Sequence, residues 1–385
     1  MKRSFLFPLF SLLISASAFA DDSEPKLKVE PMGRVLIDGA LYASPQKEEF
    51  PDGMAITEAR IGAKMRYGKW HAFLDVAYSY AKIGLRNMWL EYNINDRNRV
   101  RFGNFIQPFG LESTYTNSLK CTFEQPMAGA LFTPGIQLGV MYGYTAPSVW
   151  IGTGFHVESS ALSNAMNAPL FNQQGYGILG RVVWRKAPTE GPIFQLGISG
   201  EFATPQRRLE DNEDVHDGFS ISTNFPTKVV QKSAVGTTVE NSKNLFKFSP
   251  EFIIAKDRLA LEGQYFFQTI SRRKNLCNYN SQSGYVSLRG LLTKSGYTYS
   301  SDLAALARPN PGSLECVLTY NYLTLSDSGA GIFGGRANNA NVTLNYYINP
   351  YVTARLNYTF THTWNREGYD PITMNGFQAR IMVLF

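Results

Sequence analysis

The chain ends in GFQARIMVLF, residues 376–385, and this stretch alternates like a β-strand with a nearly pure apolar face. The apolar face consists of Phe377, Ala379, Ile381, Val383 and Phe385. Because successive side chains of a strand point to opposite faces, one side of this strand belongs in a fully apolar environment. Such an end is a liability for a soluble chain, whereas a membrane barrel needs a closing strand with a lipid-facing side. The stretch therefore predicts the last strand of a transmembrane barrel.

The first twenty residues, MKRSFLFPLFSLLISASAFA, have the three parts of a signal peptide. These are a charged start at Lys2 and Arg3, a short apolar run over residues 5–14, and a small-x-small cleavage site at residues 18–20. The apolar run is too short to span a bilayer. We therefore predict that residues 1–20 are a removed signal peptide, that the protein is exported to the outer membrane of a Gram-negative bacterium, and that residues 21–385 form one barrel domain.

The composition favours an all-β membrane protein. Aromatic residues make up 14% of the chain and charged residues 18%, and there are 33 glycines. Aromatic side chains gather in belts at the two water–lipid boundaries of membrane barrels. The odd number of cysteines (Cys121, Cys277 and Cys316) matches no metal site or disulfide framework, and leaves one disulfide plus a free thiol open.

Alternating runs recur along the whole chain, and we count about sixteen of them. An even number is the rule for bacterial outer-membrane barrels, and sixteen strands leave an aqueous channel. The fold class predicted is an all-β, up-and-down antiparallel transmembrane barrel. In residues 341–360 the face opposite the apolar one carries Asn, Thr and Arg, which predicts a wet interior instead of a packed core. The runs begin near residues 31, 54, 70, 86, 98, 135, 148, 174, 192, 244, 257, 282, 313, 337, 351 and 373.

The connections between these runs alternate between short and long, as expected for periplasmic turns and external loops. One connection breaks this pattern, because residues 294–312 are long where a short turn is expected. Short turns are expected at 68–69, 95–97, 145–147, 256 and 349–350, and long loops at 107–134, 158–173 and 204–243.

Three stretches resemble the phosphate-selective porin O and P family. They are ARIGAKMRYGKWHAFLDV (59–76), LEYNINDRNRVRFGNFIQPFGLE (90–112) and GGRANNANVTLNYYINPYVTARLNY (334–358). The resemblance implies an outer-membrane porin, a homotrimer in the lipid bilayer, that passes small anions such as phosphate along a path of arginines. It also implies that loop 107–134 narrows the channel and that its Lys120 faces the path.

The sequence departs from the family at one telling place. Phosphate-selective members carry an Arg-Arg pair where this chain has Thr57 and Glu58, and Arg60 lies one step beyond Ala59. A carboxylate beside the path works against phosphate, so we expect an anion-leaning porin, with phosphate or polyphosphate specificity left open. The candidate residues of the anion path are Arg60, Arg99, Arg101, Lys120, Arg355 and Arg380.

Two alternatives stand beside this reading of the charged residues. The arginines could simply keep the lumen wet by pairing with carboxylates such as Glu91 and Asp75, and Lys120 could be an ordinary solvated loop lysine. The acidic run at residues 210–214 has the oxygen ligands that Ca²⁺ prefers, but its spacing fits no calcium loop.

Other functions fit the sequence less well. A surface-exposed binding or structural barrel with a closed lumen is the main alternative to a porin. An enzyme needs a nucleophile with a base in reach, and His156 with Ser159 or Ser160 is the nearest pairing. We expect no enzyme, no cofactor and no metal site. We also expect no nucleic-acid partner, because the basic charge is dispersed along an exported chain.

Overall fold

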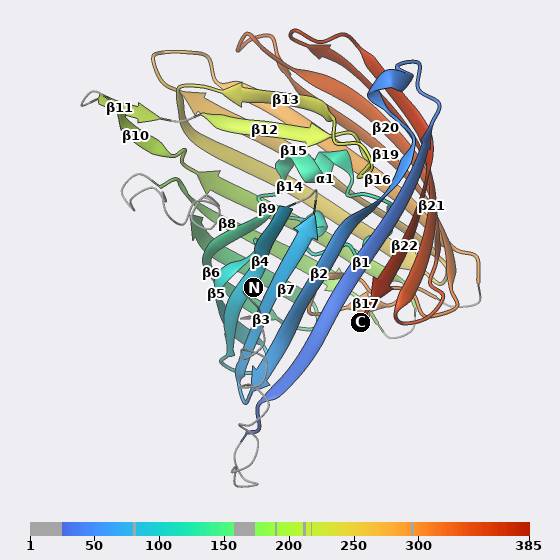
Figure 1. Ribbon diagram of the computed structural model, residues 1–385. Helices are drawn as coiled ribbons and strands as arrows, with labels where there is room; N and C mark the ends of the chain where they lie inside the picture. Colours follow the sequence, from blue (N-terminus) through green and yellow to red (C-terminus); the bar gives the residue numbers. More distant parts are fainter. Residues whose placement is uncertain are drawn as a thin grey trace, which may run out of the picture.

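The computed structural model describes residues 25–79, 82–157, 174–188, 191–210, 213–216, 218–293 and 296–385. Over these residues the chain forms a closed antiparallel barrel of sixteen strands (Figure 1). Each strand pairs with the next one along the barrel, and the last pairs with the first, which confirms the predicted fold class. The barrel strands are β1 (Lys28–Tyr42), β2 (Gly53–Tyr67), β3 (Trp70–Ser79), β4 (Lys82–Asn93), β5 (Asn98–Ile106), β6 (Ile136–Thr145), β7 (Val149–Val157), β8 (Tyr176–Lys186), β9 (Ile193–Ala203), β14 (Ser242–Lys256), β15 (Leu259–Arg272), β16 (Tyr279–Leu291), β19 (Leu314–Asp327), β20 (Ile332–Tyr346), β21 (Val352–Arg366) and β22 (Ile372–Leu384).

The connections between barrel strands hold smaller elements. Among the described residues, none of the helices is long and apolar enough to cross a membrane. The predicted signal peptide, residues 1–20, lies outside the described residues. The smaller elements are the hairpins β10 (Arg207–Glu210) with β11 (Glu213–His216), β12 (Phe219–Asn224) with β13 (Ser233–Val239), and β17 (Tyr299–Ser300) with β18 (Ala305–Leu306), and the short helices η2 (Lys47–Glu49), η3 (Leu111–Ser113) and α1 (Met127–Phe132).

The barrel closes between β1 and β22, as the terminal stretch predicts. The pairing runs from Arg34 opposite Leu384 to Tyr42 opposite Gly376. Phe385 extends it, because the Gly33 N–H donates to the Phe385 carbonyl at 2.6 Å and the Phe385 N–H donates to the Gly33 carbonyl at 3.1 Å. The Phe385 ring lies over Gly33, where a Cβ would come within 2.2 Å of it.

Deleting Phe385 is expected to lower the yield of folded barrel without changing the conductance of the molecules that fold. The deletion removes two backbone hydrogen bonds and the ring that covers Gly33 at the closing seam. The measurement is the fraction of heat-modifiable, folded protein on a gel after refolding into lipid vesicles. Phe385→Leu keeps the backbone pairs and an apolar side chain, and serves as the matched control. A normal yield of the deletion variant would contradict this role for the terminus.

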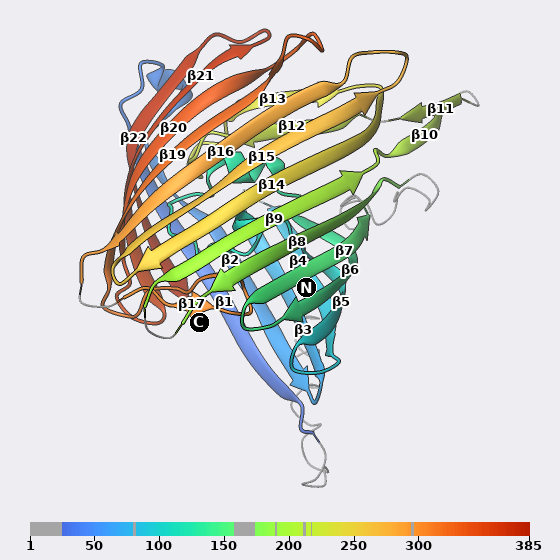
Figure 2. The ribbon, with the colours of Figure 1, turned by 180° about the vertical axis from the view of Figure 1, so that it is seen from behind.

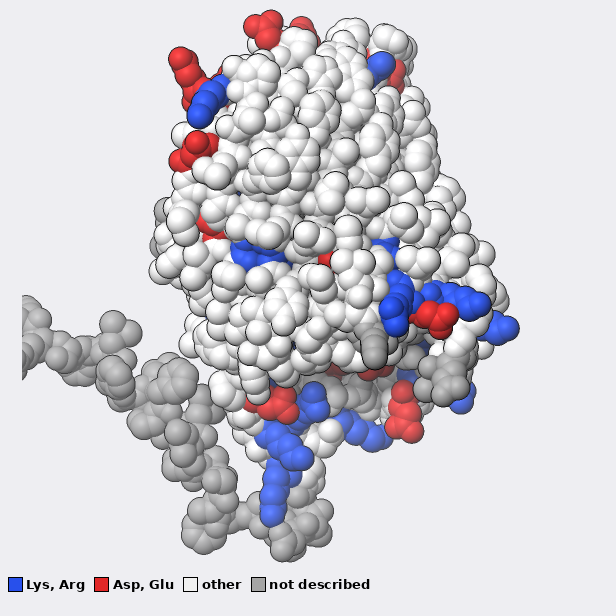
Figure 3. All heavy atoms as spheres, turned by 90° about the vertical axis from the view of Figure 1, so that its right-hand side faces the viewer, with Lys and Arg blue, Asp and Glu red and all other residues white. Residues whose placement is uncertain are grey.

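The two faces of the barrel strands differ as their alternation requires. On β20 and β21, Val342, Leu344 and Leu356 are exposed on the outside. Thr343 and Asn357 are buried inside, where the Thr343 hydroxyl donates to Oδ1 of Asn357 at 2.8 Å. The side of the barrel seen in Figure 3 has a broad uncharged area with charged side chains above and below it. An uncharged band with exposed apolar side chains such as Leu344 and Leu356 is the surface that lipid chains require.

One side of the lumen is packed with apolar side chains, so the prediction of a wet interior is wrong for this side. Loop 107–135 lies inside the barrel, and its helix α1 is seen there in Figure 1. Phe132 of α1 stacks on Phe266 of β15 with ring centroids 5.7 Å apart, and Phe109 lies against the same ring at 6.5 Å. The reason is that β15 and β16 carry the inward side chains Phe266 and Tyr285. Burial of these rings under the loop removes apolar surface from water and stabilises the folded protein.

Residues 296–313 also fold into the lumen, which explains why this connection breaks the alternation of short turns and long loops. The Trp150 indole N–H donates to the carbonyl of Asp302 at 3.1 Å, and Arg181 donates to the carbonyl of Ala304 at 3.0 Å. Ala304 and Leu306 are fully buried. Figure 1 shows β17 inside the barrel at the end where the short turns lie.

At the other end of the barrel, the hairpin of β12 and β13 crosses the mouth (Figures 1 and 2). We call residues 219–239 the mouth hairpin. At its tip Phe225 packs edge-on against Phe50 with ring centroids 5.1 Å apart. The hydroxyls of Thr227 and Tyr42 lie 2.5 Å apart, and the Gln378 side chain donates to the hairpin backbone. The tip is therefore fixed to β1 and β22, on the far side of the lumen from β9 and β14.

Candidate functional site: a charged eyelet in the lumen

A cavity of about 270 Å³ lies inside the barrel where three parts of the chain meet. One part is the wall formed by β2, β3 and β4, the second is loop 107–135, and the third is the tip of the mouth hairpin. We call this cavity the eyelet. Its lining residues are Glu58, Ala77, Ser79, Arg86, Asn117, Lys120, Glu124, Gln125, Met127, Ala130, Thr223, Asn224, Phe225, Pro226, Thr227, Lys228 and Gln231.

The lining of the eyelet carries a small excess of positive charge. Arg86, Lys120 and Lys228 supply three positive charges, and Glu58 and Glu124 supply two negative ones, so the net charge is 3 − 2 = +1. In a cavity with low-dielectric walls, an excess of one sign raises the local concentration of the opposite ion. Amide and hydroxyl groups occupy most of the remaining lining, as suits a hydrophilic solute.

Lys120 is the predicted path residue that the structure places directly on the eyelet. Its Nζ donates one long hydrogen bond, 3.4 Å, to Oε1 of Gln125. Burial lowers the pKa of Lys120 to about 8. Burial also raises the pKa of Glu112, in the same loop, to about 7. Both groups therefore change charge close to neutral pH.

Raising the pH from about 6 to about 9 is expected to weaken the preference of the pore for anions. At the lower pH Lys120 is charged and Glu112 is neutral; at the higher pH Lys120 is neutral and Glu112 is charged. Both changes make loop 107–135 more negative. The measurement is the reversal potential in a salt gradient across this pH range, with Lys120→Gln expected to show a smaller shift. A reversal potential that stays constant with pH would contradict this titration.

Arg355 lies behind loop 107–135 and binds it to the wall. Its Nη1 donates to the carbonyl of Thr122 at 3.0 Å, and its Nη2 donates to the carbonyl of Lys120. The side chain is only 1% exposed. The contacts of Arg355 are therefore to the backbone of the loop and not to the eyelet.

Arg380 holds the next part of the same loop. Its guanidinium forms a bidentate pair with Asp38 at 2.6 and 2.7 Å, donates to the carbonyl of Phe123 at 2.6 Å, and pairs with Glu124. Arg380 is 3% exposed. Arg355 and Arg380 are paired neighbours on β21 and β22, and together they fix residues 120–124, the segment that carries Lys120.

The other three predicted arginines keep more contact with the lumen. Each is paired inside the barrel, as the alternative reading of the sequence expects, but 13%, 17% and 22% of the side chains of Arg60, Arg99 and Arg101 stay exposed. They lie on β2 and β5, so they extend the basic surface along the wall. Their contacts are Arg60 Nη1 to Asp75 Oδ2 at 3.1 Å, Arg99 Nη1 to Thr145 Oγ1 at 3.1 Å, and Arg101 Nε to Glu91 Oε2 at 2.9 Å.

Three basic residues at or beside the eyelet were missed in the sequence, as was the acidic Glu124 of its lining. Arg34 could have been found, because alternation along β1 puts it on the same face as Asp38. Arg86 lies at the predicted start of its strand, where the face is ambiguous. Lys228 gives no local signal at all, because only the fold of the mouth hairpin brings it into the lumen.

The residues named for the alternative functions do not form a site in the described structure. His156 pairs with Glu201, Nε2 to Oε1 at 3.1 Å, and Ser159 and Ser160 lie outside the described residues. Two members of the acidic run, Asp211 and Asn212, also lie outside them. Within the described ranges, no group of three or more His, Cys, Asp or Glu residues could hold a metal ion. The cysteines are free thiols, with Cys121 buried, Cys277 exposed and Cys316 half-buried.

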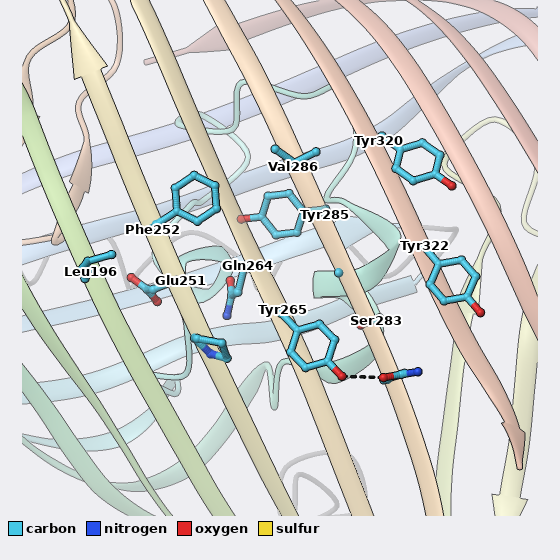
Figure 4. Close-up of a pocket in the computed structure, with 13 residues that line it drawn as sticks. Leu196, Glu251, Phe252, Gln264, Tyr265, Ser283, Tyr285, Val286, Tyr320 and Tyr322 are labelled. Carbon is cyan, nitrogen blue, oxygen red and sulfur yellow. Dashed lines mark hydrogen bonds between the residues drawn. The ribbon is translucent and has the colours of Figure 1, made fainter.

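A second hollow, of about 680 Å³, lies on the outer wall of the barrel and is almost wholly apolar. Figure 4 shows it from outside, with loop 107–135 behind the strands. Leu196 and Phe252 stand at one side and Tyr320 and Tyr322 at the other. Its small floor residues, among them Gly284, explain why the wall is depressed there. This groove belongs to the lipid-facing surface and not to the eyelet.

Comparison with known families identifies the chain. The profile of the family "Phosphate-selective porin O and P" matches residues 60–385. The chain belongs to this family. The porin is therefore an outer-membrane channel by family and by fold. No curated protein matches it.

Solved porins share the fold at low sequence identity. In vitro folded OmpT, an outer membrane protein of Vibrio cholerae, has a TM-score of 0.60 and 12% identity, and the match covers 96% of this chain and 100% of that one. The trimer form of OmpT has a TM-score of 0.59 and 11% identity, and the match covers 93% of this chain and 99% of that one. An anion-selective porin from Comamonas acidovorans has a TM-score of 0.59 and 11% identity, and the match covers 94% of this chain and 100% of that one. At these identities the likeness is one of fold.

Proposed function

We propose that this porin lets small hydrophilic solutes diffuse passively across the outer membrane, with a preference for anions. The observation that carries the proposal is the eyelet, whose lining has a net charge of +1 and holds Lys120 and Lys228. An open channel needs no chemistry beyond a shaped and charged opening. The family name and the anion-selective porin of similar fold support the same direction.

The proposed mechanism is electrostatic. Arg99 and Arg101 on β5, and Arg60 on β2, draw anions along the wall, and Lys120 and Lys228 meet them at the eyelet. Arginine can hold an oxyanion in a bidentate fork, whereas lysine acts as a movable point charge. In this mechanism Arg355 and Arg380 contribute indirectly, by keeping loop 107–135 and its Lys120 in place.

Phosphate specificity is a separate question, because the family Arg-Arg pair is absent. The Thr57 hydroxyl donates to Oδ2 of Asp38 at 2.6 Å, and Glu58 is paired with Arg34. Neither side chain offers an anion a donor. We therefore propose a general preference for small anions, with phosphate as one of the solutes to be tested.

We propose further that residues 1–20 are cleaved on export and that the mature chain assembles as a homotrimer in the bilayer. The three-part pattern of the first twenty residues supports the cleavage. The trimer form of OmpT, which shares the fold, supports the assembly. Cross-linking of the mature protein in native membranes would show the expected trimer band.

The test is the reversal potential of the purified protein in a planar bilayer under a salt gradient, measured first in chloride and then with added phosphate. We expect a current that is selective for anions. Block of the chloride current by low phosphate concentrations would add a phosphate site, and anion current without block would indicate a general porin. A selectivity for cations would overturn the proposed preference.

The same experiment tests the second candidate, a binding or structural barrel with a closed lumen. The packing of loop 107–135 and of residues 296–313 inside the barrel is the observation that favours it. A folded protein that inserts into the bilayer and carries no current would replace the porin by this candidate.

A further inference from the structure

Glu58 occupies an unusual position on the wall of the eyelet. The register between β1 and β2 shifts at Leu36 and Ile37, so that Leu36 lies opposite Glu58 and Ile37 lies opposite Ile56. Thr57 is the extra residue, and as a result both Thr57 and Glu58 are buried on the lumen side. Glu58 is 5% exposed and still contributes to the lining of the eyelet.

The carboxylate of Glu58 is surrounded by cations from three separate elements. Nε of Arg34, on β1, donates to Oε1 at 2.7 Å, and Nη2 of the same guanidinium contacts the same oxygen. Nζ of Lys228, on the mouth hairpin, lies 3.8 Å from Oε2, and Nε of Arg60, on β2, lies 3.9 Å from Oε1. The side-chain amide of Asn117, on loop 107–135, donates to Oε2 at 2.9 Å.

These groups form a cradle for an oxyanion. Two guanidinium groups, one ammonium group and one amide converge on a single pair of oxygen atoms. This is the donor set with which proteins bind free carboxylates and phosphates. In this chain the carboxylate of Glu58, a side chain of the barrel wall, occupies the cradle.

We infer that Glu58 is the specificity-determining residue of the eyelet: it occupies an oxyanion cradle formed by Arg34, Arg60, Lys228 and Asn117, and so keeps the pore a weakly anion-selective one. This inference rests on the proposed function, since it explains how strongly the porin prefers anions. The solute class that the cradle would accept in the absence of Glu58 is a small oxyanion, a carboxylate or a phosphate.

The test compares the Glu58→Gln variant with the unaltered porin in planar bilayers. The amide keeps the shape of the side chain but removes its charge, which changes the net charge of the lining from 3 − 2 = +1 to 3 − 1 = +2. The ratio of chloride to potassium permeability is expected to rise roughly threefold to tenfold. The reason is that the variant removes one negative charge that would repel a passing anion and attract a passing cation at contact distance. The phosphate concentration that halves the chloride current is expected to fall by a similar factor.

Two further variants separate charge from structure. Glu58→Gln combined with Lys228→Gln returns the lining to a net +1, and is expected to bring the permeability ratio back toward that of the unaltered protein. Glu49→Gln removes a carboxylate that pairs with Lys232 outside the eyelet, and is expected to leave the ratio unchanged. Should Glu58→Gln not fold, Glu58→Asp keeps the charge of the lining but shortens the side chain, so that its carboxylate no longer reaches Arg34 and Lys228 together. It is expected to leave the permeability ratio near that of the unaltered protein and to lower the phosphate concentration that halves the chloride current; an unchanged phosphate block would contradict the cradle.

The outcomes for the inference and for the proposed function are distinguishable. The unaltered protein alone tests whether the pore prefers anions, whereas the ratio between variant and unaltered protein tests the role of Glu58. A cation-selective unaltered porin whose permeability ratio still rises in Glu58→Gln would overturn the proposed anion preference, and of the inference it would leave only that Glu58 sets the selectivity of the eyelet. An anion-selective pore whose permeability ratio and phosphate block do not change in Glu58→Gln would overturn the inference alone.

Discussion

Replacing Lys120 with glutamate is expected to reverse the ion preference of the pore. The eyelet lining then has two cations and three carboxylates, so its net charge changes from +1 to 2 − 3 = −1. A change of two charges at the lining alters the anion-to-cation permeability ratio by roughly tenfold or more. The reversal potential under a salt gradient should change sign or come close to zero.

The barrel should still fold with this substitution, because Lys120 belongs to loop 107–135 and not to the barrel wall. Lys120 contributes one hydrogen bond of 3.4 Å through its side chain, whereas its carbonyl, which accepts from Arg355, remains in the variant. The folded yield on a gel is the check. Lys243→Glu introduces the same change of charge at an exposed position near the external end of β14, and is the matched control. Unchanged selectivity in a folded Lys120→Glu protein would remove Lys120 from the path.

Replacing Arg380 with methionine is expected to release loop 107–135 from the wall. The substitution removes the hydrogen bond to the Phe123 carbonyl and leaves Asp38 and Glu124 without their guanidinium partner. Removing one partner of a buried ion pair lowers the free energy of unfolding by about 3–5 kcal/mol, because the remaining charge stays buried without a partner. Arg380 is 3% exposed, so solvent offers little compensation.

Two measurements follow from this change. The free energy of unfolding in lipid vesicles should fall by about the amount given for a broken buried pair, and single-channel currents should become noisier because the loop fluctuates in the lumen. Arg101→Met is the control for the current noise, since Arg101 also pairs with a buried carboxylate, Glu91, but donates to no backbone group of the loop. Quiet currents and an unchanged stability in Arg380→Met would contradict the clamping role.

The alternation of residues along the chain was sufficient to predict the barrel. All sixteen strands begin close to the predicted residues, with the largest difference at β20, expected near residue 337 and observed from Ile332. The prediction works because a strand turns its side chains to opposite faces at every residue, and lipid on one face and water on the other leave a strong local signal. The same signal placed Arg60, Arg99, Arg101, Arg355 and Arg380 on the lumen side.

The sequence could not say what those arginines do there. Arg355 and Arg101 both face inward, yet Arg355 is buried against the backbone of loop 107–135 while Arg101 keeps a fifth of its side chain exposed. The difference depends on where a loop more than 200 residues away in the chain comes to lie. No pattern in the sequence around Arg355 or Arg101 predicts where loop 107–135 comes to lie.

For this porin, the sequence alone determined the strand number, the faces of the strands and the membrane class, because each follows from contacts that every strand makes with its own surroundings. The tertiary structure decided the charge of the eyelet. Lys228, Glu58 and Lys120 meet only because the mouth hairpin, the bulged strand β2 and loop 107–135 converge inside the barrel. That convergence is a product of long-range packing, of Phe132 on Phe266 and of Phe225 on Phe50, which alternation along a single strand does not record.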